Sequence, residues 1–102
     1  MKIVGLTKLE KFMIKHSRAK SPLSAWVQDA QDSEWKTTQD IRDRYRSADF
    51  LKDNRLVFNI GGNNFRLVVI VRYQNGIVMI QKIGTHAEYN KWKLDWTLFN
   101  RN

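Results

Sequence analysis

Two turn signals in the second half of the chain restrict its fold more than any other feature. Residues 61–64 read Gly-Gly-Asn-Asn, and residues 75–76 read Asn-Gly. They separate three runs of alternating or branched apolar residues, over 55–60, 65–73 and 77–83. Glycine and asparagine accept the positive φ angles of tight hairpin turns. The pattern therefore predicts three consecutive antiparallel strands joined by short hairpins.

The centres of these turns predict which residues pair across the strands. The first turn places Phe58 opposite Leu67, and the second places Val71 opposite Ile80. One face of the sheet is then apolar, with Lys82 at its margin. This apolar face carries Leu56, Phe58, Ile60, Phe65, Leu67, Val69, Val71, Val78 and Ile80, and the opposite face carries Arg55, Asn59, Arg66, Arg72, Gln81, Thr85 and Ile83. A slip by one residue would exchange the faces and bury three arginines, so this register is strongly constrained.

The first half of the chain has the period of helices. Residues 7–16 begin with Thr7 and Glu10, which are spaced as a capping box, and carry apolar residues at helical spacing. A second helix is predicted to start at Ser21 and Pro22, where a capping residue precedes a proline suited to the first turn. Each predicted helix has one apolar stripe, which can cover the apolar face of the sheet.

Shorter elements complete the predicted fold. We expect a third helix from Thr38, a short strand within residues 1–5, and a short final helix where Thr85 and Glu88 form another capping box. No repeat, linker or low-complexity tract divides the chain, so a single domain over residues 1–102 is expected. The predicted fold class is α+β, with N-terminal helices packed on one face of an antiparallel β-sheet and a short C-terminal helix.

The charge of the chain indicates the kind of partner it binds. Eighteen Lys and Arg residues oppose ten Asp and Glu, which gives a net charge of +8. A field of this sign attracts polyanions, of which nucleic acid is the commonest in the cytosol, although a merely soluble basic surface is the alternative. The longest apolar run, residues 67–71, is far shorter than the roughly 20 residues of a membrane span. We therefore expect a cytoplasmic protein that makes no contact with membranes.

Elimination narrows the chemistry that such a chain can perform. The absence of cysteine excludes disulfides and thiolate sites, and residues 54–102 hold only two carboxylates, too few for a metal-dependent nuclease. Three arginines on one sheet face match the geometry of phosphate, although a solvated face is the alternative. What remains is metal-free acid–base chemistry on a phosphodiester, with no metal or other cofactor. A 2′-hydroxyl attacks the neighbouring phosphorus, arginines stabilise the developing charge, and a histidine or tyrosine moves protons.

Two motifs make the chain similar to a known family. Residues 57–68 read VFNIGGNNFRLV and residues 83–89 read IGTHAEY. They closely resemble the HigB family of bacterial type II toxins, within the wider RelE-like group, and the resemblance extends to about residue 91. It implies a ribosome-dependent endoribonuclease that cuts translated mRNA in the ribosomal A site. It also implies a HigA-type helix-turn-helix antitoxin as partner, with DNA contacted only indirectly through that antitoxin.

The resemblance implies where the site lies. Arg66 belongs to the first motif, and His86 and Tyr89 belong to the second. We expect Arg66 to stabilise phosphate charge, His86 to act as general base or acid, and Tyr89 to partner it or to stack on a base. Glu88 is expected to cap its helix. The expected RNA-binding residues are Arg55, Asn63, Asn64, Arg72, Lys82 and Lys91, of which the two asparagines mainly shape the turn.

The chain departs from the family pattern after the second motif. Asn90 stands where many relatives carry aspartate, so no role is assigned to an acid at that position. Trp92, Trp96 and Phe99 follow, and we expect them to pack on the core in preference to stacking on bases. A second class of function stays open, a non-catalytic RNA- or ribosome-binding module. Both classes explain the charge, but only the enzyme needs a histidine and a tyrosine beside the arginines.

Overall fold

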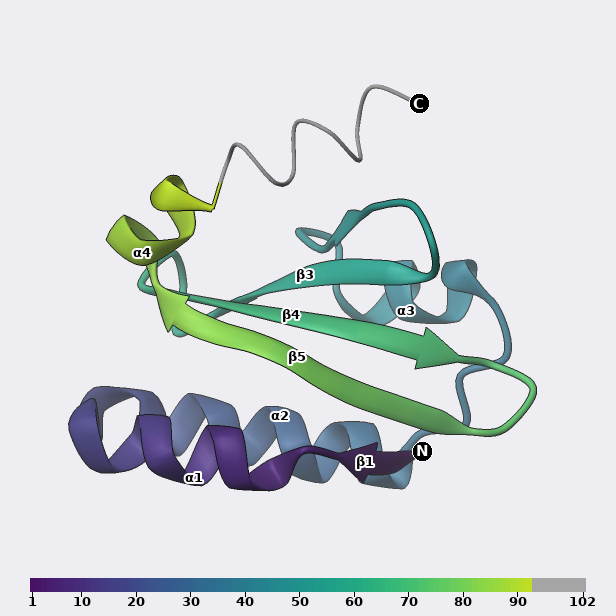
Figure 1. Ribbon diagram of the computed structural model, residues 1–102. Coiled ribbons are helices and arrows are strands. Elements are labelled where there is room, and N and C mark those ends of the chain that lie inside the picture. The colour runs from purple at the N-terminus through teal and green to yellow at the C-terminus, as the bar shows by residue number, and fades with distance from the viewer. Residues whose placement is uncertain (93–102) are drawn as a thin grey trace.

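The computed structural model describes residues 1–92 as a five-stranded sheet with helices on both sides (Figure 1). In chain order the elements are β1 (Lys2–Val4), α1 (Leu6–Lys15), the 3₁₀ turn η1 (Ser17–Ala19), α2 (Lys20–Asp32), α3 (Thr38–Arg44), β2 (Asp49–Phe50), β3 (Arg55–Ile60), β4 (Phe65–Arg72), β5 (Ile77–Thr85) and α4 (His86–Lys91). The strands lie in the order β1-β5-β4-β3-β2. Helices α1 and α2 cover one face of the sheet, and α4 lies on the other. In this described part of the chain, no helix is long and apolar enough to cross a membrane.

The architecture confirms the predicted α+β class, with the N-terminal helices on one sheet face and a short helix after β5. The sheet is mixed, however, because β1 pairs in parallel with β5. Three α-helices and three strands separate these two strands along the chain. Parallel neighbours require such a long connection, whereas antiparallel ones can be joined by a hairpin. The prediction of an antiparallel sheet therefore holds for β2 to β5 and is wrong for β1.

The helix-covered face of the sheet forms the main core. All the apolar residues predicted for this face are buried there, together with Leu9, Leu23 and Trp26 from the helices. Phe58 contacts the rings of Trp26 in α2 and of Tyr45, the residue after α3, with ring centroids 5.2 and 5.0 Å away. Burial of this apolar surface is the main force that holds the helices on the sheet.

The first hairpin has the predicted register. Phe58 pairs with Leu67 across β3 and β4. Gly61 and Gly62, in the turn between them, have φ angles of 62° and 69°. Residues with a Cβ rarely adopt this left-handed conformation, so the two glycines are what allows the tight reversal.

The second hairpin differs from the prediction by two residues. Arg72 pairs with Ile77, so four residues connect β4 and β5, and Val71 lies opposite Val78 instead of Ile80. The reason is that Gly76, with φ of 67°, ends a longer loop and is not the second residue of a two-residue turn. Because the shift is even, Val71 keeps its predicted face.

A β-bulge in β5 reverses the faces of the residues that follow it. Val69 pairs with Ile80 but Val68 pairs with Lys82, which leaves Gln81 as an extra residue. The prediction that Lys82 borders the apolar face is therefore wrong, because the extra residue moves it to the opposite face. Ile83, predicted on the arginine face, packs instead against the main core.

The starts of the first two helices also differ from the prediction. Helix α1 starts at Leu6, after Gly5 with φ of 96°, and no side chain caps it, so the predicted capping box at Thr7 is wrong. A Cβ on Gly5 would lie 3.1 Å from the Cβ of Ile80, so the close approach of backbone to β5 decides where the helix begins. Helix α2 begins at Lys20, one residue before the predicted cap, because the 3₁₀ turn leads directly into it.

We predict that Leu67→Ala lowers the free energy of unfolding by about 2–5 kcal/mol, because the side chain fills the main core and is 0% exposed. Ile14→Ala is the matched control, since it shortens an apolar side chain that is 84% exposed. Its effect should stay within about 0.5 kcal/mol. Urea unfolding of both variants measures the difference, and equal stabilities would contradict the assignment of the buried face.

Candidate functional site

The sheet face opposite α1 and α2 carries a second, smaller apolar cluster. Val57 and Val68 are fully buried there, and Leu51, Tyr89 and Trp92 pack against them. Figure 1 shows α4 on this side of the sheet. The face is therefore not simply solvated, which was the alternative to a phosphate-binding face, because α4 and the residue after it cover part of it.

Helix α4 is held against the first hairpin turn by short-range contacts. Thr85 and Glu88 form the predicted capping box, in which each side chain accepts a hydrogen bond from the backbone N–H of the other residue, at 3.2 and 2.9 Å. The backbone N–H of His86 donates to the carbonyl oxygen of Asn64 at 3.0 Å. These bonds place His86 and Tyr89, three residues apart on α4, beside the glycine–asparagine turn.

Arg66 is the centre of this corner of the sheet. Its side chain is 9% exposed, and its Nη1 donates to the carbonyl oxygens of Asn63 at 3.0 Å and of Phe65 at 3.2 Å. The guanidinium carbon lies over the Tyr89 ring, 5.5 Å from the centroid. Within residues 1–92 the other N–H groups of this guanidinium make no hydrogen bond. They are available to an anion, for which the planar fork is well suited.

The electrostatic surroundings of Tyr89 keep its phenol protonated. Burial raises the pKa of the Tyr89 hydroxyl above its ordinary value of about 10, and the negative charge of Asp49 raises it further. The positive charge of Arg66 acts in the opposite direction without cancelling the shift. At neutral pH the hydroxyl therefore carries its proton and can act as a hydrogen-bond or proton donor.

The remaining candidates lie at different distances from Arg66. His86 and Lys91 have exposed side chains at the two ends of α4. The ammonium of Lys82 lies 5.2 Å from the ring centroid of Trp92, so the bulge brings this cation to the α4 side. Asn63 and Asn64 lie in the turn, where their carbonyl oxygens accept hydrogen bonds from the Arg66 side chain and from the start of α4.

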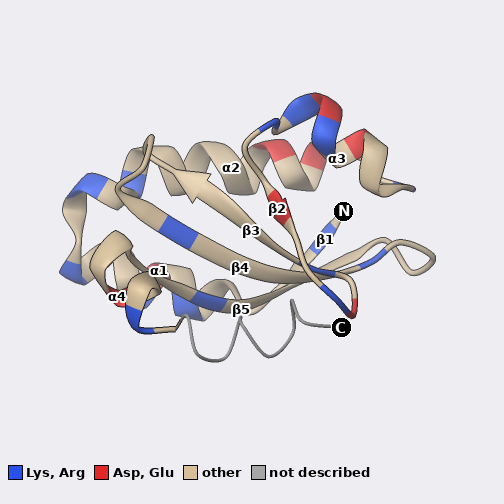
Figure 2. Cartoon of the chain, turned by 90° about the horizontal axis from the view of Figure 1, so that it is seen from above, with Lys and Arg blue, Asp and Glu red and all other residues tan. Residues whose placement is uncertain are grey.

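Two predicted phosphate contacts lie far along the sheet. Arg55 pairs with Ile70, four residues from Arg66 on β4, and Arg72 is six residues away. At about 3.3 Å per residue these separations are roughly 13 and 20 Å. The structure thus brings Arg66, His86 and Tyr89 to one corner and places Arg55 and Arg72 elsewhere on the same face. Figure 2 views this face, with basic segments on β4 and β5 and an acidic one on β2.

The packing of Trp92 on the second cluster depends on a glycine that sequence reasoning did not single out. A Cβ on Gly84 would lie 2.8 Å from the Trp92 ring, so any larger residue would displace the ring. A glycine inside a strand often marks such a close approach, and this was the available signal. The expected packing of Trp92 on the protein is confirmed. Trp96 and Phe99 lie outside the described residues.

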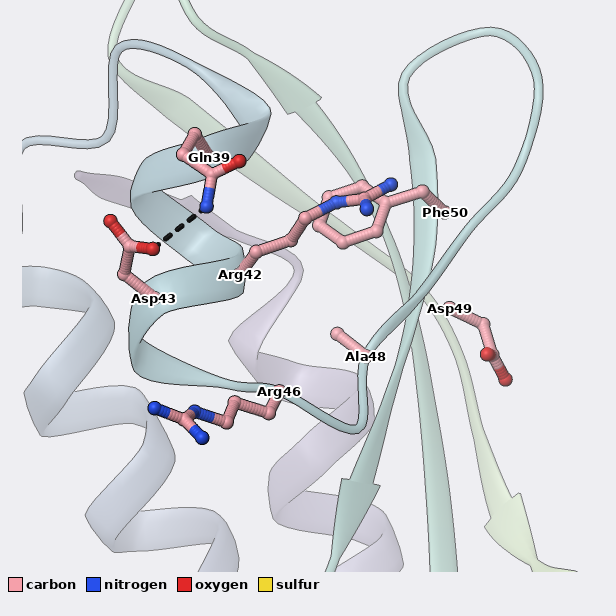
Figure 3. Close-up of a pocket in the computed structure, with 7 residues that line it drawn as sticks. All are labelled: Gln39, Arg42, Asp43, Arg46, Ala48, Asp49 and Phe50. Carbon is pink, nitrogen blue, oxygen red and sulfur yellow. Dashed lines mark hydrogen bonds between the residues drawn. The ribbon is translucent and has the colours of Figure 1, made fainter.

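A shallow cleft of about 790 Å³ lies between α3 and β2 (Figure 3). Its lining residues are Gln39, Arg42, Asp43, Arg46, Ala48, Asp49 and Phe50. The Arg42 guanidinium lies over the Phe50 ring, 4.6 Å from the centroid. Of the two aspartates, Asp43 accepts a hydrogen bond from Gln39 at 2.8 Å, and the Asp49 carboxylate points away from Arg42 (Figure 3).

In the part of the chain that the structure describes, no three His, Asp or Glu side chains gather so that they could hold a metal ion. A guanidinium lies over a protonated phenol, and an exposed imidazole stands at the start of the same helix. This set can bind an anion and exchange protons with it.

Comparison with known proteins points to one family. Residues 19–92 match a family described as HigB toxin, the RelE-like toxic component of a toxin–antitoxin system. The chain is 30% identical over 78 residues to the mRNA interferase toxin HigB of Escherichia coli strain K12, which covers 74% of this chain and 75% of that protein. It is 24% identical over 93 residues to the mRNA interferase HigB of Escherichia coli O6:H1, which covers 89% of this chain and 90% of that protein.

Because Arg66 holds two carbonyl oxygens, we predict that Arg66→Ala lowers the free energy of unfolding by about 1–3 kcal/mol. Arg72→Ala is the matched control, since that arginine is exposed at the end of the same strand, and it should change stability by no more than about 0.5 kcal/mol. Urea unfolding followed by circular dichroism measures both. Arg66→Ala and Arg72→Ala proteins of equal stability would show that Arg66 has no structural part.

Proposed function

Because the chain belongs to the HigB toxins, the RelE-like toxic components of toxin–antitoxin systems, we propose that it is an endoribonuclease that cleaves mRNA. The names of its two E. coli relatives, mRNA interferases, support this activity. The observation that carries the proposal is the Arg66 guanidinium over the Tyr89 ring, next to His86 on a basic sheet face. The corner offers one group to bind phosphate and two to move protons.

The proposed reaction is a transesterification without a metal ion. The 2′-oxygen of the RNA attacks the adjacent phosphorus, and the bond from phosphorus to the 5′-oxygen breaks. The 2′-hydroxyl proton passes to a base on the protein, and an acid returns a proton to the departing 5′-oxygen. The products are a 2′,3′-cyclic phosphate and a free 5′-hydroxyl. The unbonded N–H groups of Arg66 stabilise the negative charge that develops on the phosphoryl oxygens.

The two proton carriers are His86 and Tyr89. The exposed imidazole of His86 can reach a substrate and is proposed to act as base or acid. The raised pKa of Tyr89 favours a role for its hydroxyl as donor, either to the leaving oxygen or to the phosphate. Its half-buried ring is also a surface on which a base of the RNA can stack.

We further propose that cleavage depends on the ribosome, with the message in the A site. The cations beyond the Arg66 corner support this, because Arg55, Arg72, Lys82 and Lys91 extend the basic surface over more phosphates than one cleaved bond requires. The partner that restrains the toxin is proposed to be a HigA-type helix-turn-helix antitoxin, through which DNA is contacted. Residues 1–102 are proposed to act as one toxin domain.

We predict that His86→Ala lowers cleavage of a translated reporter message by about 10² to 10⁴ fold, the usual contribution of a general acid or base. Asn90→Ala is the matched control, because Asn90 is exposed one turn further along α4. Cleavage rates in a translating extract measure both. Equal cleavage by the His86→Ala protein and its parent would make His86 structural. Ribosome binding by the parent without cleavage would favour a non-catalytic binding module.

We also predict that a message with a 2′-O-methyl group at the cleaved nucleotide resists cleavage, because the nucleophile is blocked. The unmodified message should yield ends with a 5′-hydroxyl and a 2′,3′-cyclic phosphate, which ligation-based end mapping distinguishes. Cleavage of the methylated message, or products with 5′-phosphates, would point to attack by water and against the proposed mechanism.

A further inference from the structure

We propose that Asp49 reads a base of the message and selects bases with an amino group on their pairing edge over uracil. This inference rests on the proposed mRNA cleavage and names a specificity-determining residue for it. Asp49 is the acidic residue that the sheet places on the Arg66 side, on β2 at its edge (Figure 2).

The register determines which way Asp49 faces. It pairs with Val57, whereas Phe50 pairs with Leu56. Paired residues share a sheet face, so Asp49 lies on the side of Val57, against which Tyr89 packs. Phe50 lies on the helix side, beneath the Arg42 guanidinium. Figure 3 shows the Asp49 carboxylate pointing away from these two side chains.

The carboxylate is close enough to Tyr89 to act on it and is otherwise unengaged. Its negative charge is one of the causes that raise the pKa of the Tyr89 hydroxyl. Asp49 is exposed, and within residues 1–92 its carboxylate makes no hydrogen bond or ion pair. It therefore presents two free acceptor oxygens to whatever lies beside the Tyr89 ring.

A site that cleaves RNA must bind a phosphate, transfer protons and hold a nucleobase of the substrate. An ionised carboxylate repels phosphate, so Asp49 weakens the first task. The second task already has His86 and Tyr89, whose side chains come from α4. Proteins that recognise single-stranded RNA stack unpaired bases on aromatic rings and bind their Watson–Crick edges by hydrogen bonds. A carboxylate next to Tyr89 can therefore take part in holding the nucleobase.

The chemistry of a carboxylate predicts which bases it accepts. A carboxylate only accepts hydrogen bonds, and it pairs well with the amino groups of adenine, cytosine and guanine. Uracil presents two carbonyl oxygens on either side of a single N–H. A carboxylate oxygen can accept a hydrogen bond from that N–H, but the carbonyl oxygens on both sides of it repel the carboxylate, and uracil is therefore disfavoured.

A structural role for Asp49 makes a different prediction. β2 is an edge strand, and charged residues on edge strands prevent pairing with other chains. A charge kept for that purpose has no influence on which base is cleaved, so the base profile of cleavage separates the two roles.

The test compares Asp49→Asn with Asp53→Asn, a matched control that removes the same charge from an exposed loop residue between β2 and β3. Cleavage sites are mapped across translated messages, and the base frequencies are compared at each position around the cut. The parent should disfavour uracil at one position by about tenfold, which corresponds to about 1.4 kcal/mol. An asparagine side chain both donates and accepts, so Asp49→Asn should remove this discrimination, whereas Asp53→Asn should keep it.

An unchanged base profile in the Asp49→Asn protein would overturn the inference, as would a loss of cleavage that is equal for all four bases. Melting temperatures of both variants verify that they are folded. A second measurement uses the His86→Ala protein, which should bind short single-stranded RNAs of adenine more tightly than those of uracil, and this preference should disappear when Asp49→Asn is added. A parent that cleaves no message would refute the proposed function itself, a result separate from any change in base profile.

Discussion

The pairing of β3 with β4 is the constraint on which the rest of the molecule depends. It places Phe58 and Leu67 under the helices and Asn59 and Arg66 on the opposite face. A slip of one residue would put the guanidinium into the main core, where an unpaired charge costs several kcal/mol, and would expose the largest apolar side chains. This register positions the helices on both sides of the sheet. Helices α1 and α2 pack on the apolar face, and α4 packs on Val57 and Val68 on the other face.

Several local features of the chain together position α4, the helix that forms one side of the Arg66 corner. The bulge at Gln81 turns Lys82 toward Trp92, Gly84 leaves room for that ring, and the Thr85–Glu88 capping box starts α4 beside the hairpin turn. The capping residue contributes on the order of 1 kcal/mol, and all three features favour the same position of α4. In the proposed mechanism Arg66 has two roles, because the guanidinium that hydrogen-bonds to the Asn63 carbonyl oxygen in the turn also binds the phosphate.

The sequence predicted what local signals encode and missed what depends on distant contacts. Gly61 and Gly62 fix a turn through their own backbone freedom, so the first hairpin and its buried face followed from the sequence. Gln81 has no local signal for a bulge, and Thr7 carries a capping signal that the approach of Gly5 to Ile80 overrides. The residues of the candidate site were named from motifs. The burial of Arg66 could not be predicted, because it depends on how Tyr89 packs against it. Asp49 was not singled out because a two-residue strand shows no periodicity.

The parallel pairing of β1 with β5 has a consequence for the order of folding. β1 is made first, but its partner residues 77–79 are among the last of the described chain to be synthesised. Until β5 is available, α1 and α2 have no complete sheet on which to bury their apolar stripes, and nearly the whole chain must close before β1 is held in place. Such long-range closure slows folding. The Arg66 corner also needs α4, so in the nascent chain it assembles only after α1, α2, β3 and β4 have all been synthesised.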